Sequence, residues 1–171
     1  MTTGTVWVED PPHEPDGPVK AVIDTNVWVN IFLQKAVSDP RQPYADIDSA
    51  LKDREFVPIY CAETRDELDY ILKDGRNVGV KYKIRPDLVD DFIGAIFYEA
   101  GIFVEITGYV FVSSDEDDDM FAEAAVVGGA QFLVTEDPDL HEDSVKQYLC
   151  PHGIRVIWPN QFRRMLGELR A

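Results

Sequence analysis

Four acidic residues, far apart in the chain, are candidates for binding a divalent cation. Asp24 and Asp137 each follow a short apolar run, Glu67 lies in a stretch whose apolar residues have helical spacing, and Asp119 precedes an alanine-rich stretch. Neighbouring carboxylates repel one another unless protons or cations neutralise them. Oxygen ligands suit magnesium or manganese, whereas zinc normally takes His or Cys. One or two such ions can activate water and stabilise a phosphoryl transition state, so phosphodiester hydrolysis is the natural reaction.

An alternation of strands and helices would bring these acids together. Short apolar runs predict strands at residues 19–23, 56–60, 102–106, 131–135 and 154–158. Helical spacing and capping signals predict helices that begin near Asn26 and that cover residues 44–54, 62–73, 88–100, 120–127 and 159–169. This order predicts an α/β fold, a three-layer α/β/α sandwich with a central parallel sheet of about five strands.

The predicted sheet gives these acids a common location. Parallel strands end at one shared edge, and the functional crevice opens there, where the strand order reverses. Asp24 and Asp137 lie just past such strand ends. Asp119 lies in the opening turn of the helix before the fourth strand, and Glu67 can lean from its own helix towards the crevice. We therefore expect the four acids to meet at this edge.

The bulk properties fit one ordinary domain. The chain has 171 residues, 45% of them hydrophobic, and we expect a single domain at residues 19–171 after a Pro-rich, acidic and flexible leader at residues 1–18. Neither a membrane-spanning run nor a secretion signal is visible, so we expect a soluble cytoplasmic protein. The net charge of -16 repels polyanions, so any contact with nucleic acid must be local. Cys61 and Cys150 lack metal-site spacing and are expected to be reduced thiols.

Each acid also has a purely structural interpretation. Asp24 suits a turn with a helix cap, Glu67 a solvated helix face, and Asp137 an Asp-Pro turn with capping. The dipole of the following helix favours acids at residues 115–119, and Asp119 is singled out from them by position. A calcium loop over the same acids is excluded, because Met and Val stand where the loop needs Gly and Glu.

Four segments carry a resemblance to a known family. They are AVIDTNVWV, TRDELDYIL, SDEDDDMFAEAA and FLVTEDPDL, and together they span residues 19–140. In this order they resemble the motifs of the PIN-domain family of nucleases, in particular its bacterial branch of toxin components from toxin–antitoxin pairs. Glu116 and Met120 stand where relatives commonly have Pro and Lys.

The resemblance implies roles for individual residues and for partners. It implies four metal-binding and catalytic acids, Asp24, Glu67, Asp119 and Asp137, and three supporting residues, Asn26, Thr135 and Asp139. It also implies Mg2+ or Mn2+ as cofactor, RNA as substrate, an antitoxin protein as partner, and a homodimer. Two groups of basic residues would contact phosphates if they flank the crevice, and are otherwise solvated: Lys81, Lys83 and Arg85, and Arg163 and Arg164.

Our interpretation is a metal-dependent endoribonuclease, and two alternatives stay open. The first is a phosphohydrolase that uses Asp24 as a covalent nucleophile. Such an enzyme normally has a second acid two residues further on, where this chain has Asn26. The second is a non-catalytic binding module that retains the fold and uses its acidic surface for a partner.

Overall fold

The computed structural model describes residues 17–36 and 42–169. Except for its last two residues, the leader predicted at residues 1–18 lies outside this part of the chain. Its strands are β1 (Val19–Ile23), β2 (Phe56–Tyr60), β3 (Ile102–Phe103), β4 (Phe132–Val134) and β5 (Arg155–Ile157). They form one parallel sheet in the order β3-β2-β1-β4-β5. The strand order therefore reverses between β1 and β4.

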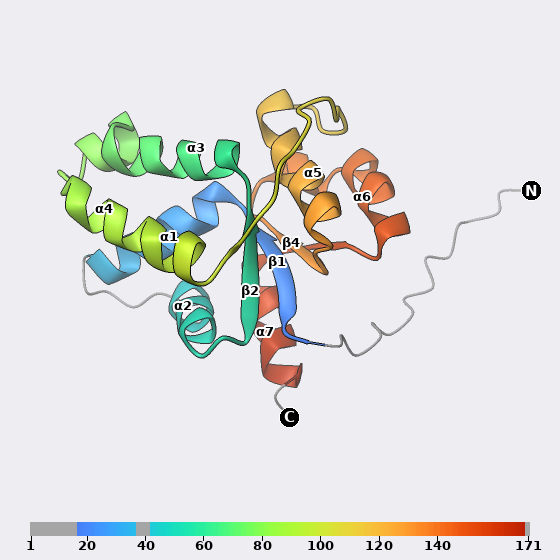
Figure 1. The fold of residues 1–171 in the computed structure, drawn as a ribbon, viewed down its shortest axis with the longest axis horizontal. Helices are drawn as coiled ribbons and strands as arrows, with labels where there is room; N and C mark the ends of the chain where they lie inside the picture. Colours follow the sequence, from blue (N-terminus) through green and yellow to red (C-terminus); the bar gives the residue numbers. More distant parts are fainter. Residues whose placement is uncertain (1–16, 37–41, 170–171) are drawn as a thin grey trace, which may run out of the picture.

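Helices connect these strands and cover the sheet. The α-helices are α1 (Thr25–Ala36), α2 (Tyr44–Lys52), α3 (Ala62–Lys73), α4 (Pro86–Ile93), α5 (Asp119–Gly128), α6 (Asp143–Leu149) and α7 (Pro159–Leu169). The shorter helical segments are η1 (Arg76–Val80), η2 (Gly94–Glu99), η3 (Glu116–Asp118), η4 (Pro138–His141) and η5 (Cys150–His152). Helices α1 to α4 lie on one side of the sheet, and α5 and α6 lie on the other (Figure 1). The predicted three-layer α/β/α sandwich is confirmed.

The sheet has a hydrophobic core on each face, and successive residues of a strand point alternately into the two cores. On β1, Ala21 and Ile23 pack in the core with α1 to α4 and α7, while Val22 packs in the core with α5 and α6. On β4, Phe132 and Leu133 divide in the same way. Successive side chains of a strand point to opposite faces, so continuous apolar runs are needed for a sheet that is buried on both sides.

The boundaries of several elements differ from the sequence predictions. The third strand has two residues instead of five: the amide of Val104 still donates to the carbonyl of Tyr60 on β2, and residues 104–106 are not part of the strand. The segment 76–80, which lies between two of the predicted helices, is π-helical, and the predicted helix at residues 88–100 continues from α4 into the π-helical η2.

The end of α5 shows why glycine is required there. A Cβ atom on Gly128 would lie 2.6 Å from Ile59 Cγ2, so a larger residue would push α5 away from β2. Gly129 ends the helix in the left-handed region, with φ of +65°. This close approach packs the end of α5 directly against β2.

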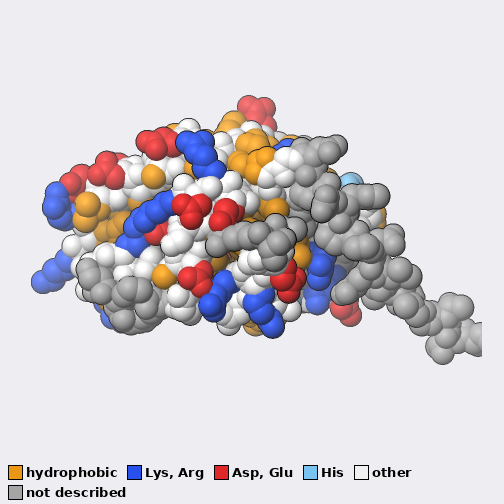
Figure 2. Space-filling model, turned by 90° about the horizontal axis from the view of Figure 1, so that it is seen from below, with side chains coloured by type: hydrophobic (Ala, Val, Ile, Leu, Met, Phe, Trp, Pro, Cys, Tyr) orange, Lys and Arg blue, Asp and Glu red, His pale blue; other side chains and the backbone are white. Residues whose placement is uncertain are grey.

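Two further findings concern the distribution of surface charge and the length and polarity of the helices. Seen from below, from the side where β1 and β2 begin, Lys and Arg side chains are interspersed with Asp and Glu over the described residues (Figure 2). The net negative charge is therefore not gathered on that side. Among the described residues, every helix is too short or too polar to cross a lipid bilayer.

Candidate metal centre

Asp24 lies directly after β1 and is 3% exposed. Its backbone amide donates to the carbonyl of Val134 at 2.9 Å, and its carbonyl accepts from the first turn of α1. The Thr135 hydroxyl donates to Asp24 Oδ2 at 2.8 Å. The pKa of Asp24 is raised from 3.8 to about 6, mainly by burial and additionally by the nearby carboxylates of Glu67 and Asp137, while the hydrogen bonds to its side chain lower it. The fold thus holds this carboxylate where ionisation is unfavourable.

Thr135 joins the ends of β1 and β4. It follows β4 directly and is completely buried. Its hydroxyl oxygen, which donates to Asp24, also accepts from the amide of Asp137 at 2.9 Å. The register pairs Ile23 with Val134, so the residues after each strand come to the same level of the edge. The position of Thr135 agrees with the supporting role that the sequence suggests.

The turn after β4 is fixed by its own side chains. Asp137 Oδ1 accepts from the amide of Asp139 at 2.9 Å, which caps η4. The ring nitrogen Nε2 of His141 lies 2.8 Å from the carbonyl oxygen of Thr135, and this ring stacks on Trp158 with centroids 3.9 Å apart. Glu136 points elsewhere and accepts from the hydroxyl of Tyr44. The turn therefore presents Asp137 and not Glu136 to the edge.

Glu67 reaches the edge from α3. The hydroxyl of Thr25, the residue after Asp24, donates to Glu67 Oε2. Burial raises the pKa of Glu67, and the carboxylates of Asp117 and Asp115 add to this effect. The apolar stripe of α3 is on the core side, with Leu68 buried, so Glu67 occupies the border of the helix, as expected from its spacing.

Asp118 and Asp119 point in different directions. Asp119 is 4% exposed, and its Oδ1 accepts from the amides of Val112 at 3.1 Å and Ser113 at 2.7 Å. Asp118 instead lies within hydrogen-bonding reach of Asp137. Burial, this contact and the nearby Asp24 carboxylate raise the pKa of Asp118. The structure therefore brings Asp118 to Asp24 and Asp137, whereas Asp119, the acid selected from the sequence, holds a neighbouring loop.

The phase of the helix explains the difference. Adjacent positions on an α-helix point about 100° apart, so only one of two consecutive acids can face a given neighbour. Asp119 shares a side of α5 with Glu123, one turn later, and both receive backbone amides from the segment before α5.

Further acids complete the cluster. Carboxylate oxygens of Asp115, Asp118 and Asp139 all lie within 4.8 Å of one another. The Oδ2 atoms of Asp118 and of its neighbour Asp119 are both buried and have no hydrogen-bond partner among the described residues. Within residues 17–36 and 42–169, no Lys, Arg or His forms an ion pair with these three acids, or with Asp24 or Asp137. A partly exposed, all-oxygen site without a described protein counter-ion fits a hard divalent cation.

The remaining sequence candidates lie outside the cluster or on its margin. Asn26 is exposed, and its side chain forms no hydrogen bond to the described residues. Arg85 forms an ion pair with Asp87 at the start of α4, and Arg163 on α7 forms one with Asp46. These two arginines are paired with surface acids, so they are not free to neutralise the carboxylates.

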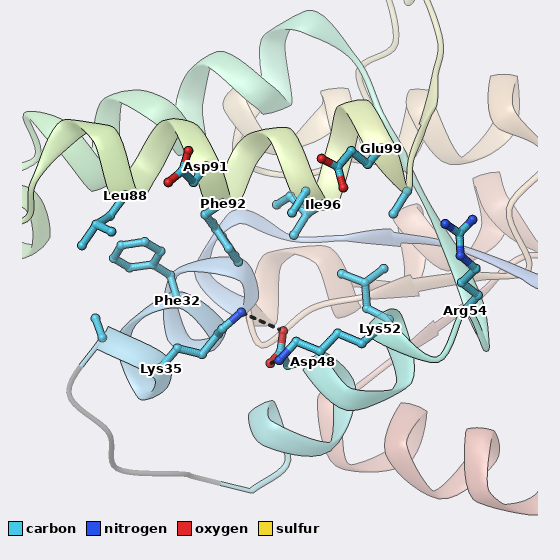
Figure 3. A pocket seen from close by; sticks show the side chains of 14 residues that line it. Phe32, Lys35, Asp48, Lys52, Arg54, Leu88, Asp91, Phe92, Ile96 and Glu99 are labelled. Carbon is cyan, nitrogen blue, oxygen red and sulfur yellow. Dashed lines mark hydrogen bonds and ion pairs between the residues drawn. The ribbon is translucent and has the colours of Figure 1, made fainter.

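A cavity of about 610 Å³ lies between α1, α2 and α4, away from the acids. Phe32, Phe92 and Ile96 form apolar walls, and Asp48 accepts from Lys35 at its mouth (Figure 3). None of the candidate acids lines this cavity. Since a cation that activates water needs a cluster of oxygen ligands, and the clustered acids lie outside this cavity, we locate the candidate site at the acids.

Comparison with known proteins agrees with the site's geometry. A family model described as PIN domain matches residues 20–139, which is more than half of the chain and includes every acid of the cluster. No curated protein matches the chain. PIN domains are generally metal-dependent nucleases, and both the parallel sheet and the acidic cluster fit such a protein. The chain belongs to the PIN-domain family.

Proposed function

We propose that this protein is a metal-dependent endoribonuclease that hydrolyses RNA phosphodiester bonds. One observation carries the proposal: acids from four separate segments converge at the carboxyl edge of the sheet, where no described cationic side chain neutralises them. Such an arrangement costs stability in the metal-free protein. Retaining it is understandable if the cluster serves to hold a cation.

Asp24, Asp118 and Asp137 are the proposed central ligands, with Asp115 and Asp139 beside them. Mg2+ or Mn2+ suits these oxygen atoms. A divalent cation bound there would supply positive charge to a phosphoryl group and lower the pKa of a coordinated water. We assign Asp119 a positioning role, because both of its hydrogen bonds hold the backbone of the preceding loop.

Other residues of the chain would orient the proposed metal ligands and donate a proton to the leaving group. Thr135 holds Asp24 Oδ2 and the amide of Asp137, so it sets the relative orientation of these two acids. Glu67 has one oxygen held by Thr25, and its pKa is raised by burial. Such a carboxyl group can hold a proton on its other oxygen and donate it to a leaving alkoxide.

The finer functional assignments rest on the four motif segments. Their resemblance to bacterial toxin components supports RNA as substrate, an antitoxin protein as partner, a homodimer and a cytoplasmic location. We also propose that residues 19–171 form a single domain. Growth arrest on expression, relieved by the Asp118→Asn substitution, would test the toxin assignment, and light scattering would test the dimer.

Cleavage of labelled single-stranded RNA by the purified protein tests the proposed chemistry. Manganese or magnesium should support cleavage and EDTA should abolish it. Asp118→Asn should reduce the rate by about 100-fold or more, on the scale of losing one electrostatic group at a reaction centre. Asp119→Asn is the matched control, because the amide oxygen of Asn can still accept from Val112 and Ser113. Equal rates for the two variants would contradict the assignment, as would cleavage that persists in EDTA.

A further inference from the structure

The segment between β3 and α5 is attached to α5 by two buried carboxylates. Glu123, which is 4% exposed, accepts from the amide of Thr107 at 2.6 Å and from that of Gly108 at 2.9 Å. One helical turn earlier, Asp119 accepts from Val112 and Ser113. Figure 1 shows this segment running along α5 from the sheet towards the start of the helix. Its path is therefore set at both ends.

Two aromatic rings project from the segment between these attachments. Tyr109 is 83% exposed and Phe111 is 65% exposed. Val112 packs against the core beneath α5 and α6, and Val110 is partly buried. The side chains thus alternate as in an extended strand, with the aromatic residues outward. Exposed rings on a backbone held by buried carboxylates form a surface whose position is defined.

The same segment leads into the acidic centre. Ser114 donates to Glu142 through its amide and its hydroxyl, and Ser144 donates to the carbonyl of Val112. Asp115, the next residue, belongs to the cluster with Asp118 and Asp139. Four extended residues span at most about 14 Å, so the Phe111 backbone lies within that distance of the Asp115 backbone.

We propose that Tyr109 and Phe111 form a stacking platform for unpaired bases of single-stranded RNA beside the acidic centre. This inference rests on the proposed nuclease function. Aromatic rings stack on any base and need no positive charge. That property matters in a chain with a net charge of -16, where long-range electrostatics repels the RNA backbone. Stacking supplies affinity that basic residues do not supply here.

The test is RNA binding, measured with EDTA present so that the result does not depend on cleavage. Fluorescence anisotropy compares a short oligoadenylate with an abasic ribose–phosphate oligomer of the same length, each bound to the full chain. The Tyr109→Ala/Phe111→Ala variant should bind oligoadenylate about 10-fold or more weakly and leave abasic binding unchanged. Tyr82→Ala, which removes a 47% exposed ring from the turn after η1, is the control and should bind like the unmodified protein.

The other outcomes separate this inference from the nuclease proposal. Unchanged oligoadenylate binding by the double variant, or equal losses for both oligomers, would overturn the platform. A variant that becomes monomeric while it binds RNA normally would also overturn it, because the rings would then serve self-association. The thermal shift with manganese reports on the acids and should be the same in the variant. Base-dependent binding without any metal-dependent cleavage would remove the nuclease function and leave the platform in place.

Discussion

Replacing Asp24 with Asn should make the metal-free protein more stable while it removes the response to metal. Asp24 is 3% exposed and has Glu67 and Asp137 nearby. Asn carries no charge, and its amide oxygen can still accept from the Thr135 hydroxyl, which lies 2.8 Å from Asp24 Oδ2. The substitution therefore removes an unfavourable buried charge and keeps the hydrogen bond.

The pKa of Asp24 sets the magnitude and the sign. Its pKa is 3.8 ordinarily and about 6 in the folded protein, so protons bind more tightly to the folded state. The ionised form then costs stability, a cost that is absent below about pH 4 and complete above about pH 6. The difference between these two pKa values corresponds to about 3 kcal/mol in the free energy of unfolding. Stability of the metal-free protein should fall as the pH rises through this range.

Denaturant unfolding in EDTA measures the effect at two pH values. Near pH 8, the free energy of unfolding of Asp24→Asn should exceed that of the unmodified protein by up to about 3 kcal/mol. Near pH 4, the two free energies should be about equal. The control Asp91→Asn removes an exposed carboxylate from α4 and should change stability by less than about 0.5 kcal/mol. Saturating manganese should then stabilise the unmodified protein and not Asp24→Asn.

One result would refute this reasoning directly. If metal-free Asp24→Asn is no more stable than the unmodified protein near pH 8, Asp24 does not carry an unfavourable charge there. The cluster would then have no need of a cation, and the electrostatic basis of the proposed metal centre would be lost. A manganese-induced stabilisation that survives in Asp24→Asn would show that the ion binds elsewhere.

Two further substitutions probe the groups that orient the site. Thr135→Val removes the hydroxyl that lowers the pKa of Asp24. Manganese affinity measured by calorimetry should therefore fall by about 10- to 100-fold and recover towards higher pH. Unchanged affinity would argue against a role of Thr135 in orienting Asp24. Glu123→Ala leaves backbone amides without a partner and should destabilise the fold by about 1–3 kcal/mol and speed proteolysis within residues 107–113. Glu105→Ala, at an exposed position, is the control, and cleavage at the same rate in both variants would contradict the attachment.

The placement of Asp24 and Asp137 at the same edge of the sheet follows from local sequence. Each ends a continuous apolar run, and such a run is buried on both faces only in a sheet covered by helices. The carboxyl ends of parallel strands then share an edge. The helices α3 and α7 begin and end as their spacing predicts, because capping and apolar periodicity act over a few residues. These features therefore needed no knowledge of distant contacts.

The choice between neighbouring acids was beyond the sequence. A run of five consecutive acids, residues 115–119, leads into α5, and any of them suits the start of a helix. Whether Asp118 or Asp119 meets Asp24 depends on the rotation of α5 about its axis. That rotation is set by packing of the alanine-rich face and by loop amides that bind Asp119 and Glu123. All of these are contacts between separate segments.

By itself the sequence determined where the five strands and most of the α-helices lie and that acids follow two of the strands, because these properties depend on residues close together in the chain. Tertiary structure alone decided that β4 lies beside β1, that Thr25 holds Glu67, and that Asp118 faces the cluster. Strand order, side-chain hydrogen bonds over long sequence separations and helix rotation all depend on how complete elements pack. The chemistry available to an acidic residue can thus be predicted from the local sequence, whereas the residues that surround it depend on the tertiary structure.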